Sequence, residues 1–126
     1  MPGELVHFDI PVDDVDKMTG FYRNVMGWKI EPYGQEYGGY LMIDPAPEKD
    51  PAMAVKGGMG KKQMPEQGPM NYYQTDDLEK FNQRVKDNGG QVMMEKMPVP
   101  KMGYLSVCID PEGNAFGAWL DDPNAA

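Results

Sequence analysis

The sequence predicts an α+β fold built from two copies of one small unit, in which a strand and a helix are followed by three strands. Two internal matches support this prediction. Residues 13–27 align without a gap on residues 76–90, and GYLMI at 39–43 matches GYLSV at 103–107. Because the two matches occur in the same order at nearly the same offset, we infer that the chain contains an internal repeat.

The first element of each unit is expected to be a strand. Apolar and polar residues alternate in VHFDIPV (6–12), which is typical of a strand with one buried face. The apolar face carries Val6, Phe8, Ile10 and Val12. His7 and Asp9 share the opposite face. The repeat places Met70 and Tyr72 at the corresponding positions of the second unit.

A helix follows in each unit, as indicated by apolar residues three and four positions apart. These residues are Val15, Met18, Tyr22 and Val25 in the first unit, and Leu78, Phe81 and Val85 in the second. A pair of aspartates precedes each stripe and can accept hydrogen bonds from the free N–H groups of a helix start. Asp76 and Glu79 have the spacing of a capping box. Gly27 and the pair Gly89–Gly90 are expected to end the helices.

Three strands are expected after each helix. Their ranges are 28–33, 39–43 and 52–59 in the first unit, and 91–96, 103–109 and 114–120 in the second. The chain is then one domain, with repeat 1 at about residues 4–59, a linker at about 60–69 and repeat 2 at about 70–120. We expect the residues after 120 to be loosely held. Such paired units should form curved mixed sheets around a shared cup, with one helix backing each sheet, and the cup would suit a small molecule.

Composition limits the partners. The chain has 12 Lys and Arg against 20 Asp and Glu, a formal net charge of −8. This balance argues against nucleic acids and anionic membrane surfaces, which both attract clustered basic residues. No apolar run approaches the roughly 20 residues that span a bilayer, so no membrane contact is expected. Cys108 is the single cysteine, which excludes an internal disulfide and fits a cytoplasmic protein.

The chain resembles the vicinal oxygen chelate superfamily, which includes glyoxalases, bleomycin-resistance proteins and ring-cleaving dioxygenases. The stretches that carry this resemblance are VHFDIPVDDVDKMTGFYRNVMGW, GYLMI, DDLEKFNQRVKDNGGQV and GYLSVCIDPEGNAFGAW. FYRNVMGW and DPEGNAFGAW are similar to its most recognisable signatures. The resemblance implies the paired-unit fold and, because family members often pair, a homodimer. It does not fix a function, since one fold can host many chemistries.

The resemblance also implies a divalent metal in the cup, held by the first and last strands of each unit. His7 occupies the first ligand position, but Met70 occupies the second. In the last strand of the second unit, Gly117 holds the position of the usual carboxylate ligand. In the last strand of the first unit, Lys56 is the polar residue near the expected ligand position. Catalytic zinc needs three protein ligands, and facial-triad iron needs two histidines. The chain has one histidine, so we expect no metal cofactor and retain His7 as the single candidate ligand.

We therefore expect a small-molecule-binding protein that lacks the usual metal site. The candidate ligand-binding residues are His7, Asp9, Tyr40, Met70, Tyr72, Tyr104 and Trp119. The orientation of Tyr40 and Tyr104 stays open, and core packing is an equally good role for each tyrosine. The 12 methionines are expected to fill the core.

Two alternatives remain at this point. One is a glyoxalase- or dioxygenase-type enzyme that uses an atypical metal site or metal-free acid–base chemistry through His7. The other is a structural or assembly unit, for which exposed sheet edges would provide the contact surface.

Overall fold

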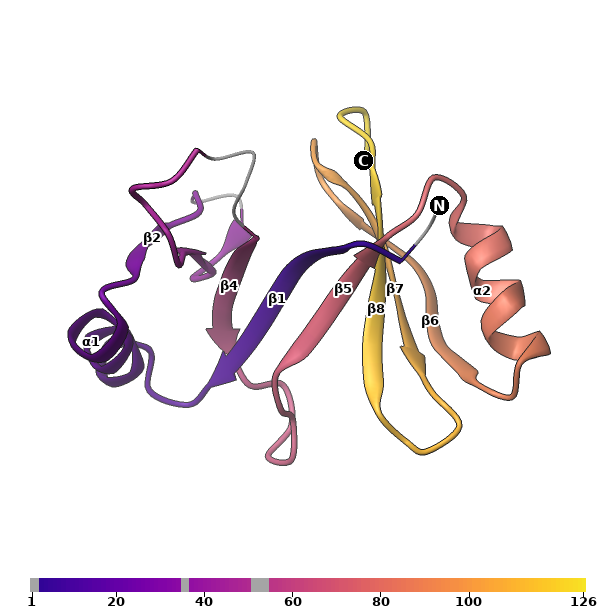
Figure 1. The fold of residues 1–126 in the computed structure, drawn as a ribbon, viewed down its shortest axis with the longest axis horizontal. Coiled ribbons are helices and arrows are strands. Elements are labelled where there is room, and N and C mark those ends of the chain that lie inside the picture. The colour runs from indigo at the N-terminus through magenta and orange to yellow at the C-terminus, as the bar shows by residue number, and fades with distance from the viewer. Residues whose placement is uncertain (1–2, 35–36, 51–54) are drawn as a thin grey trace. The chain divides into compact units, whose positions relative to one another are not determined.

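The structure, a computed structural model, describes residues 3–34, 37–50 and 55–126. The elements follow the order β1–α1–β2–β3–β4 and then β5–α2–β6–β7–β8 (Figure 1). The predicted α+β class and the duplicated arrangement of strand, helix and three strands are thus confirmed. The chain divides into two compact units, a first unit of residues 7–69 and a second unit of residues 3–6 with 70–126.

The first unit contains four strands in the order β2–β3–β4–β1. Their bounds are Leu5–Val12 for β1, Lys29–Pro32 for β2, Leu41–Asp44 for β3 and Lys56–Lys61 for β4. The part of β1 in this unit, from residue 7 onward, pairs in parallel with β4. The other two pairings, β2 with β3 and β3 with β4, are antiparallel.

The core of the first unit lies between this sheet and α1 (Val15–Met26), which contacts β2 and β4. Its buried residues are Val12, Ile30, Ile43 and Met59, and Phe8, Ile10, Val15, Met18 and Tyr22 are among the residues packed against them. The predicted apolar face of β1 is therefore confirmed for Phe8, Ile10 and Val12. The helical stripe was predicted one residue too long, because Val25 is 61% exposed and the buried face of α1 ends with Tyr22.

The helix starts are capped by aspartates as predicted. Asp14 accepts a 3.0 Å hydrogen bond from the N–H of Lys17, and Asp77 accepts one of the same length from Lys80. The predicted capping box is wrong, because α2 (Leu78–Asp87) begins directly after Asp77, which is the cap in place of Asp76. No helix in the described part of the chain is both long and apolar enough to cross a membrane.

The helix ends also follow the glycine signals. Gly27 adopts a left-handed conformation with φ of 69° and closes α1. At the end of α2, Asn88 is the capping residue, and Gly89 follows it with φ of 90°. Such torsions favour glycine because it has no Cβ atom.

The second unit holds its own four strands in the order β5–β8–β7–β6. Their bounds are Met70–Gln74 for β5, Gln91–Val99 for β6, Gly103–Ile109 for β7 and Ala115–Asp121 for β8. β5 pairs in parallel with β8, and the other pairings are antiparallel. Residues 3 and 4 hydrogen bond to Gln74, while α2 covers one face of β6, β7 and β8 (Figure 1).

Several predicted boundaries need correction. β4 starts at Lys56 and continues to Lys61, so the linker begins later than expected; positions 52–54 of that predicted strand lie outside the described residues. β6 extends to Val99 through two shifts of register. The segment after 120 is not loosely held, because the N–H of Lys101 donates to the carbonyl of Ala125, which is 5% exposed.

The methionines do not share one role. Met59 is fully buried in the core of the first unit. Five others are between 40% and 61% exposed, namely Met26, Met64, Met93, Met94 and Met97. The expectation that methionines fill the core is wrong for these five.

Candidate functional site

The sheet of the first unit has one face toward α1 and a second, polar face. Since Ile43 is in the core beside α1, its neighbours in β3, Met42 and Asp44, point to the opposite side. The register places Met42 opposite Gly58 and Asp9 opposite the same glycine on the other side of β4. We call this side the polar face; its residues are His7, Asp9, Lys29, Glu31, Tyr40, Met42, Asp44 and Lys56.

The centre of the polar face is a chain of three hydrogen-bonded side chains. The Tyr40 hydroxyl donates to Asp9 Oδ1 over 2.7 Å, and His7 Nε2 lies 3.0 Å from the same hydroxyl oxygen. Because the hydroxyl proton is directed at Asp9, His7 Nε2–H must be the donor to the Tyr40 oxygen. All three side chains are half-buried.

Burial sets the charge states in this chain. Desolvation lowers the pKa of His7 below its ordinary 6.5, against the opposing charge of Asp9. A lowered pKa favours the neutral imidazole near pH 7, in the tautomer whose Nε2–H donates to Tyr40. Desolvation raises the pKa of Asp9, although the hydrogen bond from Tyr40 and the proximity of His7 counteract the rise.

Glycines in β4 make room for the aromatic rings on both faces of the sheet. A Cβ atom at Gly58 would collide with the phenol of Tyr40, and one at Gly60 would press on the same ring. On the face toward α1, the ring of Phe8 covers Gly57 in the same manner. The glycines of this strand therefore fix where Tyr40 and Phe8 can lie.

Two further tyrosines pack beside Tyr40. The rings of Tyr33 and Tyr37 meet at 73° with centroids 5.2 Å apart, and those of Tyr33 and Tyr40 meet at 49° over 5.8 Å. The Tyr33 N–H also donates to the Tyr40 carbonyl. We call Tyr33, Tyr37 and Tyr40 the tyrosine cluster; each keeps part of its surface exposed. Sequence reasoning missed Tyr33 and Tyr37, although the spacing in YGQEYGGY was a usable signal.

The lysines of the polar face are ion-paired. Lys56 Nζ lies 3.1 Å from Asp44 Oδ2, and Lys29 Nζ lies 3.5 Å from Glu31 Oε1. The N–H of Ala46 and the Lys56 ammonium together hold the pKa of Asp44 below its ordinary value.

Three of the predicted residues in the second unit lie on the face of its sheet that points away from α2. Phe116 contacts Phe81 and therefore points toward α2. Because side chains alternate along β8, Gly117 and Trp119 lie on the opposite face. Tyr72 lies opposite Gly117 in register and its ring covers that glycine. The Trp119 indole N–H donates to Asp121 over 2.7 Å. Met70 begins β5 on the same face as Tyr72.

Tyr104 lies on the other face of this sheet. It is opposite Leu120 in the register of β7 and β8, on the side of α2, and Lys96 Nζ lies 4.4 Å from the centre of its ring. Tyr40 and Tyr104 occupy matching positions in the sequence repeat but different surroundings in the structure. Of the predicted ligand-binding residues, the structure therefore brings together His7, Asp9 and Tyr40 in the first unit, and it separates Tyr104 from Tyr72 and Trp119.

The strand registers locate the last-strand metal positions that the resemblance implies. Asp9 lies opposite Gly58, and its repeat partner Tyr72 lies opposite Gly117. Gly58 and Gly117 are therefore equivalent, and Lys56 is not the counterpart of Gly117. The ring of Tyr40 covers the first glycine and the ring of Tyr72 covers the second. Both positions lack a donor atom, and an aromatic ring occupies the space that a ligand side chain would need.

The remaining donors do not replace those ligands. Within residues 3–34, 37–50 and 55–126, no three His, Cys, Asp or Glu side chains are grouped closely enough to hold a metal ion. His7 Nε2 is engaged with Tyr40, and the Lys56 ammonium adds a positive charge to the same face. The described residues thus do not fit the divalent metal of the resembled enzymes.

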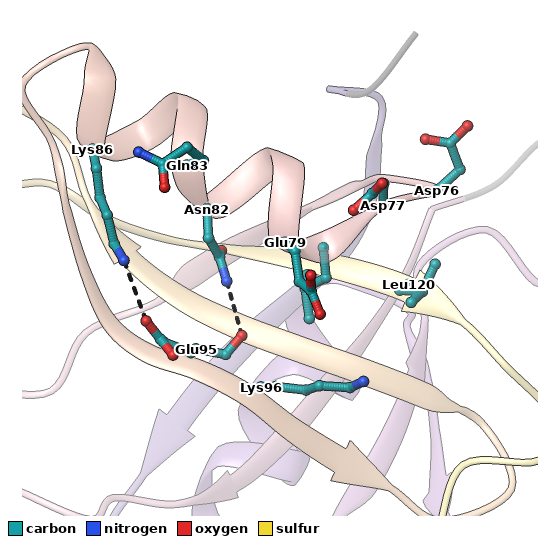
Figure 2. A pocket seen from close by; sticks show the side chains of 10 residues that line it. Asp76, Asp77, Glu79, Asn82, Gln83, Lys86, Glu95, Lys96 and Leu120 are labelled. Atoms are coloured by element: carbon teal, nitrogen blue, oxygen red, sulfur yellow. Dashed lines mark hydrogen bonds and ion pairs between the residues drawn. The ribbon is translucent and has the colours of Figure 1, made fainter.

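A groove of about 480 Å³ lies between α2 and β6 of the second unit (Figure 2). Two side chains of α2 hydrogen bond to Glu95. Lys86 donates to the Glu95 carboxylate over 3.2 Å, and Asn82 donates to the Glu95 backbone carbonyl over 2.9 Å. Eight of the groove's ten lining residues have charged or amide side chains. None of the predicted site residues lines this groove, so we place the candidate site on the polar face.

Comparison with known proteins identifies the family. Residues 4–117 match the Glyoxalase/Bleomycin resistance protein/Dioxygenase superfamily. The chain belongs to this superfamily. The resemblance inferred from FYRNVMGW and DPEGNAFGAW is thereby confirmed, and the superfamily includes proteins with several different activities.

Relatives and solved structures agree with this assignment. The chain is 28% identical to the anthracycline biosynthesis protein DnrV of Streptomyces peucetius, over 94% of this chain and 47% of that protein. It therefore spans about half the length of this curated relative. Methylmalonyl-CoA epimerase from Mycobacterium tuberculosis has the same fold, with a TM-score of 0.67 at 17% identity over 95% of this chain and 89% of that chain. A superfamily member from Vibrio splendidus 12B01 gives a TM-score of 0.62 at 16% identity over 94% and 99% of the two chains.

Proposed function

We propose that this protein binds a small organic molecule on the polar face of its first unit, without the help of a divalent metal. The observation that carries this proposal is the hydrogen-bonded chain of His7, Tyr40 and Asp9. Burying a carboxylate costs stability unless it is fully paired. Ionisable groups with pKa values displaced by burial are concentrated at functional sites, which supports a role for this chain in ligand recognition.

The tyrosine cluster supports an aromatic or partly apolar ligand. Tyrosine rings offer apolar contact area and hydroxyl groups at the same place, a combination that suits organic ligands with a few polar groups. The name of the relative DnrV, an anthracycline biosynthesis protein, favours the same ligand class. In this proposal the rings of Tyr33, Tyr37 and Tyr40 hold the ligand body, and Asp9 or His7 binds its polar group.

A compound screen on EDTA-treated protein tests the proposal. The chain has one histidine, so its imidazole signals in a ¹H–¹³C NMR spectrum are assigned without mutagenesis. Ligands of the polar face should shift the signals of His7 and of the tyrosine rings. Asp9→Asn and Tyr40→Phe should weaken that binding, whereas Tyr104→Phe in the second unit should not. Failure of a broad screen to shift these signals would overturn the proposal, as would binding that neither polar-face variant weakens.

Metal-free acid–base catalysis is the second candidate function. The specific observation in its favour is the neutral imidazole of His7, held by Tyr40 beside an ionisable carboxylate. If His7 moves protons, a bound ligand with an acidic C–H group should exchange it for deuterium in D₂O. Exchange that disappears in His7→Gln would favour the enzyme, and exchange at the solvent rate in both proteins would favour binding alone.

A further inference from the structure

The charges of the polar face do not balance. Its two lysines are already paired, Lys56 with Asp44 and Lys29 with Glu31. Asp9 is the remaining carboxylate, and no ion pair joins it to a lysine or arginine among the described residues. His7 Nε2 lies 3.0 Å from the Tyr40 hydroxyl, and that hydroxyl in turn donates to Asp9. One half-buried carboxylate on this face is therefore left without a lysine or arginine partner among the described residues.

Aromatic rings lie next to that carboxylate. The ring of Tyr40 packs within the tyrosine cluster, and its hydroxyl donates a 2.7 Å hydrogen bond to Asp9. Tyr33 and Tyr37 meet nearly edge to face, so their rings present surfaces in different directions. The face of a tyrosine ring attracts a cation through its quadrupole, and several such rings form the sites that bind quaternary ammonium groups.

We propose that the ligand of the polar face is an organic cation, such as an amine or a quaternary ammonium compound that carries an apolar group. The cation would lie against the tyrosine cluster and balance the charge of Asp9. This inference rests on the proposed binding function and specifies its ligand class. The formal net charge of −8 agrees with it, because a negative protein concentrates cationic ligands around itself.

Three aromatic probes test the inference, and the cationic and neutral ones share one shape. Benzyltrimethylammonium is the cation, neopentylbenzene replaces its nitrogen by carbon, and benzoate is an aromatic anion. We expect the cation to shift the signals of His7 and the tyrosine cluster and to bind at least about tenfold more tightly than the neutral compound, the ratio that a cation–π and charge contribution of about 1.4 kcal/mol would give. Benzoate should bind more weakly still.

Variants identify the groups responsible. Asp9→Asn should reduce the preference for the cation over the neutral probe to a few-fold, and Tyr33→Leu should weaken cation binding by about tenfold. Asp87→Asn is the matched control, because it removes one exposed negative charge from the second unit and should leave the affinity unchanged. The NMR spectrum of each variant shows whether it is folded before its affinity is compared.

The outcomes separate this inference from the proposed function. Equal binding of the cationic and neutral probes, tighter binding of benzoate, or no binding of the cation would each overturn the organic-cation inference. In those cases the compound screen still decides the proposed function, since other organic molecules can shift the signals of His7. An equal loss in Asp9→Asn and Asp87→Asn would show attraction by net charge alone and would also overturn the inference.

Discussion

The hydroxyl group of Tyr40 serves two neighbours, since it donates to Asp9 and accepts from His7. Tyr40→Phe keeps the ring over Gly58 but leaves two half-buried polar groups without this partner. We expect the free energy of unfolding to fall by about 1–3 kcal/mol, the usual cost of leaving buried polar groups unpaired. Urea denaturation measures the change. Tyr104→Phe is the control, and a Tyr40→Phe protein as stable as the wild type would show that the hydrogen bonds contribute nothing.

The imidazole of His7 should titrate at a depressed pH. Its pKa is expected below 6.5, because burial disfavours the charged ring more than Asp9 favours it. A pH titration of the single histidine signal by NMR measures this value directly. A pKa at or above 6.5 would mean that the attraction of Asp9 outweighs desolvation, which would contradict this prediction.

Asp9 should reduce stability at neutral pH. Its folded-state pKa lies above the unfolded value of 3.8, so the folded protein binds this proton more tightly than the unfolded chain does. The contribution of Asp9 to the free energy of unfolding must therefore become more favourable as the pH falls from 7 through the folded-state pKa. Asp9→Asn keeps an acceptor for Tyr40 and removes the charge, so it should be more stable than the wild type at pH 7.

This advantage of Asp9→Asn should shrink as the pH is lowered toward 3.8. Urea denaturation of both proteins across this pH range checks it. A variant that is less stable at pH 7, with a deficit that disappears in acid, would show that the carboxylate is stabilised by its surroundings.

Sequence reasoning reached part of this site. The alternation in VHFDIPV placed His7 and Asp9 together on one face, because side-chain direction in a strand follows from position alone. It could not orient Tyr40, which precedes β3 and whose contacts with β1 depend on pairing across about 30 residues of chain. Tyr33 and Tyr37 come beside Tyr40 through local contacts instead, since the Tyr33 N–H donates to the Tyr40 carbonyl and the Tyr40 N–H donates to the Tyr37 carbonyl.

At the scale of elements, glycines in the last strand of each unit determine where the aromatic rings lie. Gly117→Ala would place a methyl group in the ring of Tyr72. We expect it to lower the free energy of unfolding by about 1–3 kcal/mol, as overpacking does. Gly20→Ala in α1 is the matched variant, because nothing lies within 4 Å of its new Cβ atom. It should raise stability by about 1 kcal/mol.

Thermal or urea unfolding of the two alanine variants compares these effects. If Gly117→Ala were as stable as the wild type, Tyr72 would not be confined to the surface of Gly117. The conclusion that the Tyr72 ring occupies the space of a metal ligand at Gly117 would then be unsupported.

The elements themselves were largely predictable because their signals are local. Asp14 caps the start of α1 and Gly27 caps its end, each through a contact within one helical turn. The sequence therefore predicts both ends of α1 correctly. β6 is longer than predicted because its extension follows the neighbouring β7, through shifts of register that no local pattern encodes. Asn82 is buried on α2, where its amide donates to the Glu95 carbonyl and accepts from the Cys108 thiol, and a helical apolar pattern does not predict these partners.

At the scale of the whole molecule, the repeat predicted the superfamily fold but not the chemistry. The family comparison confirms the former, and many activities share that fold. What distinguishes this chain is the set of residues at the implied metal positions, where Gly58 and Gly117 lie beneath tyrosine rings. A shared cup, a homodimer and the ligand itself remain predictions of the sequence.

The affinity of the best ligand from the compound screen, measured by isothermal titration calorimetry with and without EDTA, tests the central claim most directly. We predict the same dissociation constant in both conditions, because the described residues supply hydrogen bonds and aromatic rings but no three-ligand metal site. If EDTA abolished binding, and one equivalent of Zn²⁺ or Fe²⁺ restored it, the metal-independent account of the polar face would be wrong.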